Sequence, residues 1–200
     1  MLATENKDFI REHYAKFLGV EPEDFMVLSN EPVGEAQVDI IWIKPTKKFN
    51  YNVLATCGMS NFQMQEPAQC MELMMLLPPD WKVGDKKDEW WWPLELLTTV
   101  GYLPFKTGES FTLGSVISLT EDDRPFMKGT KNCGLIVTLP EHFSPEMFEV
   151  EHAEGEFLRF FQCVPVNKED IERMTETSPL KFIEFNLHNA DGPDFVVKKR

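Results

Sequence analysis

The sequence lacks the short motifs by which many soluble enzymes are identified. It contains no H-E-x-x-H and no C-x-x-C pattern, so neither a catalytic nor a structural zinc site is predicted. Both glycine-rich phosphate-binding patterns, G-x-x-x-x-G-K-[ST] and G-x-G-x-x-G, are also missing. The acidic residues are spread along the chain, and no pair stands out as a general acid and base. The sequence therefore favours a binding protein without metal or cofactor over an enzyme.

Basic residues are scarce as well. The 200 residues include 20 Lys and Arg against 33 Asp and Glu, which gives a net charge of −13. Contacts with nucleic-acid phosphates need a Lys/Arg surface, so nucleic acid is excluded as a partner. A basic protein would be attracted, with faster association at low salt, although the same acidity also maintains solubility.

Cysteines and long apolar runs are few. Three of the four cysteines, Cys57, Cys133 and Cys163, lie in or beside apolar runs and are predicted to be small buried residues in a reducing compartment. The N-terminus lacks a basic stretch followed by an apolar one, so no signal peptide is expected. No apolar run approaches the ~20 residues that span a bilayer. We therefore expect a cytoplasmic protein that does not enter a membrane.

Two local patterns come close to a reactive site. Gly58 and Ser60 form G-x-S, but Phe62 stands where a nucleophile elbow has glycine, so a tight turn is favoured over a serine nucleophile. His152 lies within the acidic run 151–156, where a solvated acidic turn is favoured over a metal site.

Hydrophobic periodicity predicts an order of one helix, three strands, one helix, three strands and two helices. The predicted helices are 6–18, 93–103, 167–176 and 178–187, and the predicted strands are 37–45, 51–59, 70–78, 110–119, 133–140 and 155–166. Neither an internal repeat nor a long polar linker divides the chain. The fold class is therefore α/β (α+β mixed): a single domain over 1–190 with a central mixed β-sheet flanked by helices, followed by a C-terminal tail over 191–200.

Three consecutive tryptophans, Trp90 to Trp92, precede Pro93. Proline suits the first turn of a helix, where its missing N–H has no effect, so the second helix is predicted to begin there. Asn6 is predicted to cap the first helix. The tryptophans are either part of the core or a platform for a ligand.

Three segments occur in a specific order: "TCGMS" at 56–60, "ELMMLLPPDW" at 72–81, and Trp92-Pro93 followed by "LELLTTVGYLP". Their order and spacing resemble the Suppressor of fused domain family in its short bacterial form, over roughly residues 35–185. One departure is Gly114-Ser115-Val116, where many members have Gly-His-Thr, so no role of that histidine carries over.

The resemblance implies a non-catalytic protein-binding domain. Animal members restrain Gli-type transcription factors by holding an extended peptide as an added strand between two domains. A second domain is not expected within this chain, so only an exposed sheet edge carries over. Bacterial members are similar to immunity proteins, which implies an antitoxin that binds a basic toxin domain directly. The alternatives are a regulatory module that binds peptides by β-strand addition and, least favoured, a serine hydrolase centred on Ser60. The identity of the partner and the oligomeric state stay open.

The resemblance also implies that the W-P pair begins a helix packed on the sheet. At least Trp92 then belongs to the core, and Trp90 or Trp91 faces outward because three consecutive side chains cannot share one face. Partner contacts are expected in the turn after the second strand and just before this helix. The candidates are Ser60, Asn61, Phe62, Gln63, Gln65, Asp88, Glu89 and Trp90. Among them Phe62, an aromatic in a polar turn, is the sharpest, unless its ring tucks onto the core.

Overall fold

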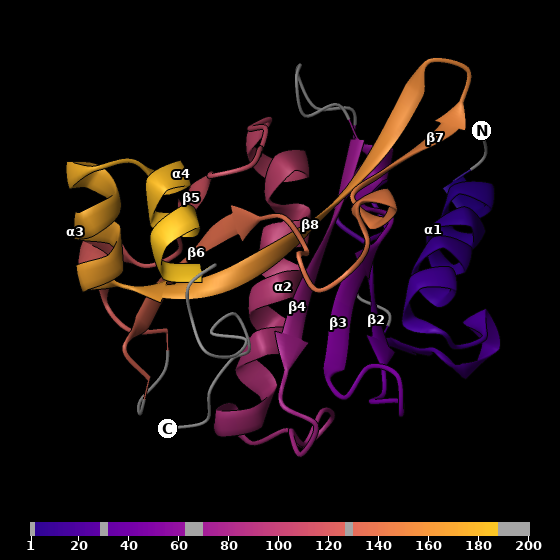
Figure 1. Cartoon of the computed structure of the whole chain (residues 1–200), viewed down its shortest axis with the longest axis horizontal. Coiled ribbons are helices and arrows are strands. Elements are labelled where there is room, and N and C mark those ends of the chain that lie inside the picture. The colour runs from indigo at the N-terminus through magenta and orange to yellow at the C-terminus, as the bar shows by residue number, and fades with distance from the viewer. Residues whose placement is uncertain (1–2, 29–31, 63–69, 127–129, 188–200) are drawn as a thin grey trace.

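The computed structural model of the chain describes residues 3–28, 32–62, 70–126 and 130–187. Strands make up its central layer (Figure 1). They are β1 (Met26–Leu28), β2 (Asp39–Ile43), β3 (Asn52–Cys57), β4 (Cys70–Leu77), β5 (Val116–Ser118), β6 (Asn132–Thr138), β7 (Glu149–Ala153) and β8 (Glu156–Asn167). All six predicted strands are confirmed, although the one predicted over 110–119 is reduced to the three residues of β5.

These strands form one mixed sheet, which confirms the predicted fold class. Their order is β1-β2-β3-β4-β8-β6-β5, and β7 pairs with β8 beside β6. Neighbouring strands are antiparallel except β4 and β8, which run parallel. The long strand β8 therefore joins the two halves of the sheet, with β4 along one side and β7 and then β6 along the other.

Two strands were not predicted from the sequence. β1 is only three residues long, and two of them are exposed. β7 overlaps the acidic run 151–156, so the interpretation of that run as a solvated turn was wrong for its first half. β7 forms through backbone pairing with β8 rather than through an apolar face of its own, and alternation of hydrophobic residues could not reveal it.

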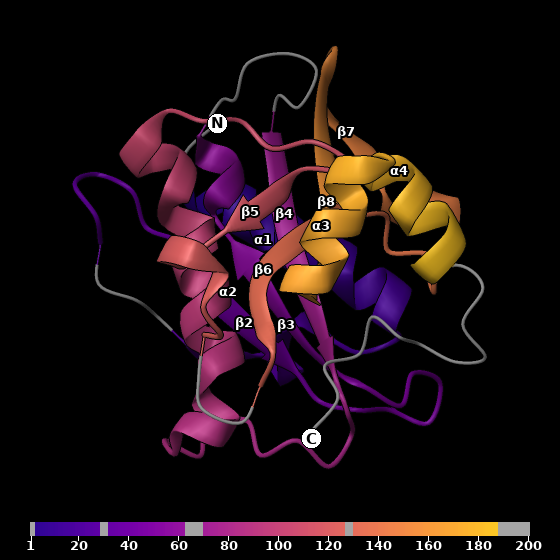
Figure 2. The ribbon, with the colours of Figure 1, turned by 90° about the vertical axis from the view of Figure 1, so that its left-hand side faces the viewer.

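Helices cover both faces of the sheet, as Figures 1 and 2 show. They are α1 (Ala3–Leu18), α2 (Asp88–Thr107), α3 (Lys168–Glu176) and α4 (Pro179–Phe182), which continues as a π-helical turn over Ile183–Leu187. α2 packs on one face with Leu54, Leu73 and Met75, whereas α1, α3 and α4 pack on the other with Ala55 and Met74. β4 is thus buried on both faces, as its nearly continuous apolar sequence predicted.

The helix ends agree in part with the sequence. Asn167 caps α3 with a capping box, and Ser178 caps α4; each cap stands at the first residue of a helix predicted from the sequence. Asn6 lies inside α1 and is not its cap, because the helix begins three residues earlier. None of the helices in the described ranges has the length and apolarity needed to cross a bilayer. The division into a domain over 1–190 and a tail stays a prediction, since 191–200 lie outside the described residues.

The tryptophan run belongs to the core. α2 begins at Asp88, so the predicted start at Pro93 was wrong, and the tryptophans lie in its first turns. Trp90 and Trp92 are buried, while Trp91 is half-buried. Trp81 packs edge-on against both buried rings, and its indole N–H donates to the backbone oxygen of Trp90 at 3.0 Å. This aromatic packing outweighs the one helical hydrogen bond that Pro93 cannot make.

Candidate functional site

A buried carboxylate organises the turn that follows β3. Glu72, on β4, is fully buried. The hydroxyl of Thr56 donates to its Oε2 at 2.5 Å, while Oε1 accepts from the N–H groups of Gly58 and Ser60, both at 3.0 Å, and from the Ser60 hydroxyl at 2.7 Å. Burial raises the pKa of Glu72 above its ordinary value, although these four hydrogen bonds act in the opposite direction.

Gly58 is required for the same turn. Its φ is +113°, in the left-handed region, and a Cβ atom there would stand 2.6 Å from the backbone oxygen of Gln37. The residues of "TCGMS" and the glutamate of "ELMMLLPPDW" therefore meet in one structure, although 12 to 16 positions separate them. The segments that carry the family resemblance thus hold the fold together at this point.

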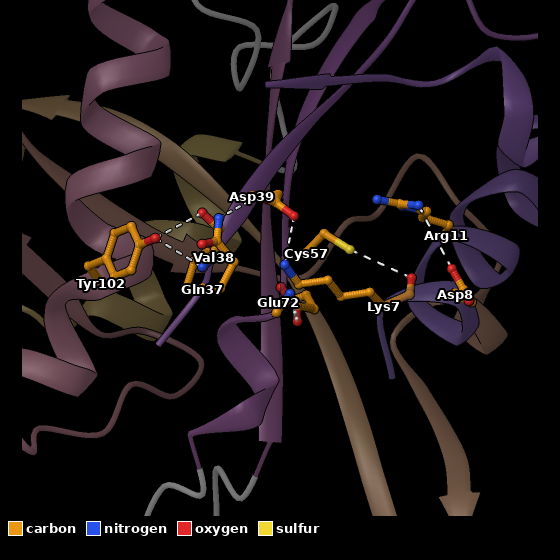
Figure 3. A network of polar contacts seen from close by, with 10 residues as sticks. Lys7, Asp8, Arg11, Gln37, Val38, Asp39, Cys57, Glu72 and Tyr102 are labelled. Carbon is orange, nitrogen blue, oxygen red and sulfur yellow. Dashed lines mark hydrogen bonds and ion pairs between the residues drawn. The ribbon is translucent and has the colours of Figure 1, made fainter. Parts of the chain in front are cut away.

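The first helix is attached to this turn by side chains. Asn6 donates to Asn61 Oδ1 at 3.0 Å and to the Ser60 hydroxyl at 3.3 Å. Lys7 forms an ion pair with Asp39 at 2.6 Å, and both groups are largely buried (Figure 3). Asp39, at the start of β2, therefore has its partner on α1.

The segment before β2 is held by hydrogen bonds from side chains, one of which comes from α2. Gln37 donates to Asp39 Oδ1 at 2.8 Å. The Tyr102 hydroxyl, from α2, accepts from the backbone N–H of Val38 at 3.0 Å and donates to its carbonyl oxygen at 3.3 Å (Figure 3). Side chains from both layers of helices therefore fix the two segments, 33–38 and 58–62, that border the candidate site.

An open groove of about 780 Å³ lies between these segments. Its lining combines charged and amide side chains with two phenylalanines: Lys7, Val33, Gly34, Glu35, Ala36, Gln37, Asn61, Phe62 and Phe105. The rings of Phe62 and Phe105 meet edge-on with centroids 5.2 Å apart, and Phe62 stays half-buried. Aromatic rings beside charged and amide side chains suit the side chains of a protein partner.

The predicted contact residues separate into distinct places. Asn61 is exposed and lines the groove together with Phe62. Asp88 and Glu89 are exposed at the start of α2, whereas Phe105 is near its end; sixteen residues at 1.5 Å each put these places about 24 Å apart. These two acids therefore do not line the groove itself.

Two further candidates do not join this surface. Ser60 is 4% exposed and Trp90 5% exposed, so neither offers a surface to a partner. Ser60 faces Glu72, and Trp90 packs on Trp81, which is the physical reason for this correction. Gln63 and Gln65 lie outside the described residues.

The geometry around Ser60 is structural. Its hydroxyl donates to a carboxylate and accepts from an amide, and no histidine bonds to it among the residues that the structure describes. His13 is stacked on Phe160 at 4.2 Å and bonds to the Met147 carbonyl, and burial lowers its pKa. The arrangement therefore lacks the nucleophile and base of a hydrolase at this point.

The cysteines and the acidic run also provide no reactive centre. Burial raises the pKa of Cys57 and Cys163 to about 12, so these thiols stay protonated and unreactive at neutral pH. Within the described ranges, no group of three or more His, Cys, Asp or Glu side chains is arranged to hold a metal ion. What the geometry offers near Glu72 is a preformed groove for binding.

A mixed α/β domain with an open groove beside a buried carboxylate is the class of protein that this fold and site define. The family model "Suppressor of fused protein (SUFU)" matches residues 34–200. The chain belongs to the Suppressor of fused family, as its three sequence segments predicted.

Solved structures share this fold. A Suppressor of fused homologue from Neisseria gonorrhoeae has a TM-score of 0.67 at 16% identity, over 98% of this chain and 96% of its own. The crystal structure of the Sufu–Fu complex has a TM-score of 0.65 at 16% identity, over 96% and 88%. Drosophila Suppressor of Fused has a TM-score of 0.61 at 16% identity, and this chain covers 48% of it. No curated protein sequence matches the chain.

Proposed function

We propose that this chain is a non-enzymatic, cytoplasmic immunity protein that neutralises a basic toxin domain by binding it directly. The observation that carries the proposal is the groove beside the Glu72 turn, where the two sequence-predicted residues Asn61 and Phe62 lie side by side in an open, partly aromatic surface. The Sufu–Fu complex contains a protein of the same fold bound to a protein partner, which supports binding of a protein partner by this chain.

The groove is suited to binding because it is ordered before the partner arrives. Phe62 is held against Phe105, and Asn61 is held by Asn6, so little side-chain freedom is lost on binding. The net charge of −13 would accelerate encounter with a basic domain, and the groove contacts would then slow its release. Inhibition would follow from covering the toxin's functional surface.

The test begins with identification of the partner by tagged capture from the native host at low and high salt. The affinity of the captured protein is then compared between the wild type and Phe62→Ala. We expect the affinity to fall about tenfold or more, as for an aromatic residue central to an interface. The free energy of unfolding should fall by only about 1 kcal/mol, because the ring is half-buried.

The matched control is Phe143→Ala. Phe143 is also half-buried and packs against another phenylalanine, Phe49, but with the core on the opposite face of the sheet. Its truncation should lower stability to a similar extent and leave affinity unchanged. Equal losses of affinity in both variants would contradict a groove contact. A captured partner without toxic activity, bound through a short unfolded segment, would instead indicate a regulatory peptide-binding module.

A further inference from the structure

The hairpin formed by β7 and the start of β8 has an open outer edge. Figure 1 shows it projecting from the end of the sheet near the start of α1. Within the described residues, β8 is the strand that pairs with β7. We call residues 149–156 the edge hairpin.

The hydrogen-bond pattern shows which backbone groups face outward. The N–H of Phe160 donates to the carbonyl of Phe148 at 2.8 Å, so this pair is hydrogen-bonded. Hydrogen-bonded and non-hydrogen-bonded pairs alternate along an antiparallel ladder. The pairing of Val150 with Leu158 is then hydrogen-bonded, and the N–H and C=O groups of Glu149 and Glu151 point away from β8. No other strand pairs with these groups in the part of the chain that the structure describes, so they form an outward-facing row of donors and acceptors.

The charge around this row is strongly negative. Four carboxylates, those of Glu149, Glu151, Glu154 and Glu156, belong to eight consecutive residues, and all four residues are exposed. Arg159, on β8, pairs with Glu149 at 2.7 Å, and among the described residues it is the one Lys or Arg that an ion pair brings to them. Four negative charges against one positive charge leave the edge hairpin with an excess of three.

A buried polar atom in the same hairpin lacks a partner. The His152 side chain is 8% exposed, and its Nδ1 atom makes no hydrogen bond within the described structure. The nearest carboxylate oxygen, Glu156 Oε2, is 3.9 Å away, too far for a hydrogen bond. Buried polar atoms are normally hydrogen-bonded, and His152 Nδ1 is an exception within β7.

We propose that the outer edge of β7 binds an extended, basic segment of a protein partner as an additional strand. The backbone groups of Glu149 and Glu151 supply the ladder, and lysine or arginine side chains of the segment pair with the carboxylates. This surface is separate from the groove beside Glu72, and the inference does not depend on the partner being a toxin.

Charge decides between the occupants of this edge. A second copy of the chain would bring the same four carboxylates against these, and like charges placed opposite each other destabilise a strand pair. A neutral strand would gain the backbone ladder but leave the excess charge uncompensated. A basic segment gains both the backbone ladder and the neutralisation of the excess charge.

The experiment uses the full chain and a synthetic eight-residue peptide of alternating lysine and valine. Amide hydrogen exchange is followed residue by residue, with and without the peptide. We expect exchange at Glu149 and Glu151 to slow at least about fivefold, because their N–H groups acquire acceptors. The Val150 amide, which already faces β8, should change little. A peptide of alternating glutamate and valine should leave all three unchanged.

Two variants test the two parts of the proposal. Glu149→Gln with Glu151→Gln removes two charges and should weaken lysine-peptide binding roughly three- to tenfold, with a smaller salt dependence. The matched control, Glu172→Gln with Glu176→Gln, makes the same charge change on exposed positions of α3, at the other side of the molecule, and should bind as the wild type does.

Glu151→Pro removes the outward N–H group. Proline is tolerated where an edge N–H faces solvent, so the ladder to β8 should persist, as retained protection of the Val150 amide would show. Protection of Glu149 by the peptide should be lost.

Equal protection by the lysine and glutamate peptides, unchanged binding by the Gln pair, or protection at β1 or β5 alone would each overturn the proposal. Absence of protection by either peptide would overturn it too, and the acids would then serve only to keep the edge unpaired.

Discussion

Two regions of this protein use glutamate in opposite ways. At the turn after β3, one carboxylate, that of Glu72, is fully buried and accepts four hydrogen bonds. In the edge hairpin, four exposed carboxylates surround a backbone edge that has no strand beyond it in the described structure. The first carboxylate is satisfied within the fold, whereas the others leave charge for a partner. Burial, rather than residue type, therefore separates the glutamate that supports the fold from those that leave an excess of exposed negative charge.

The largest expected effect is at the buried carboxylate. Glu72→Ala should lower the free energy of unfolding by roughly 3–5 kcal/mol, because the Thr56 hydroxyl and the N–H groups of Gly58 and Ser60 would lose their acceptor. Urea unfolding with an unchanged slope measures this difference. Glu172→Ala, on an exposed position of α3, should change stability by less than about 0.5 kcal/mol. A loss below about 1 kcal/mol at Glu72 would remove the contrast between the two regions.

A smaller effect should appear in the pH dependence of the free energy of unfolding. Burial raises the pKa of Glu72 in the folded protein above its ordinary value of 4.5, so the folded state holds the proton more tightly than the unfolded state. Stability that is present below that value is then lost as pH rises through the folded pKa. Glu72→Gln keeps acceptor and donor groups but does not titrate. The wild type should therefore lose stability relative to this variant as pH rises from below 4.5 through the folded pKa of Glu72.

Thermal or urea unfolding of both proteins across that range provides the measurement. The comparison removes the contribution of the other titrating groups, including His13, whose lowered pKa acts in the opposite direction. A difference that stays constant with pH, or that grows in favour of the wild type, would contradict a raised pKa at Glu72.

The smallest expected effect on stability is in the edge hairpin. Glu149→Gln with Glu151→Gln should change the free energy of unfolding by less than about 0.5 kcal/mol, because the pair with Arg159 is partly exposed and screened by water. Urea unfolding at low and high salt measures it. A loss above about 1 kcal/mol would show that these carboxylates support the fold, and would make the two regions alike.

Much of the fold could be predicted from the sequence. The apolar run of β4, the alternation in β8 and the caps of α3 and α4 are local patterns, and each of these elements is confirmed. The start of α2 could not be predicted from Pro93, because it depends on the packing of Trp90 and Trp92 around Trp81. The sequence did not predict β7, because this strand forms through backbone pairing with β8 and has no alternating apolar pattern of its own.

The candidate site was predictable only in part. Asn61 and Phe62 were found because an aromatic in a polar turn is unusual. Lys7 and Phe105 carry no such signal, and they reach the groove only because the start of α1 and the end of α2 lie near the same turn. Ser60 and Asn61 are adjacent in sequence, yet one is buried and the other exposed. The contacts of the turn, rather than its composition, decide which side chain meets solvent.

The sequence by itself determined the mixed order of helices and strands, the family and the excess of acidic residues, since periodicity, segment order and charge are properties of the chain. Only the tertiary structure decided which glutamate is buried, which aromatics share a groove and which strand edge stays open. Each of these depends on contacts between residues far apart in the chain, such as Thr56 with Glu72 and Phe62 with Phe105, and folding alone brings them together.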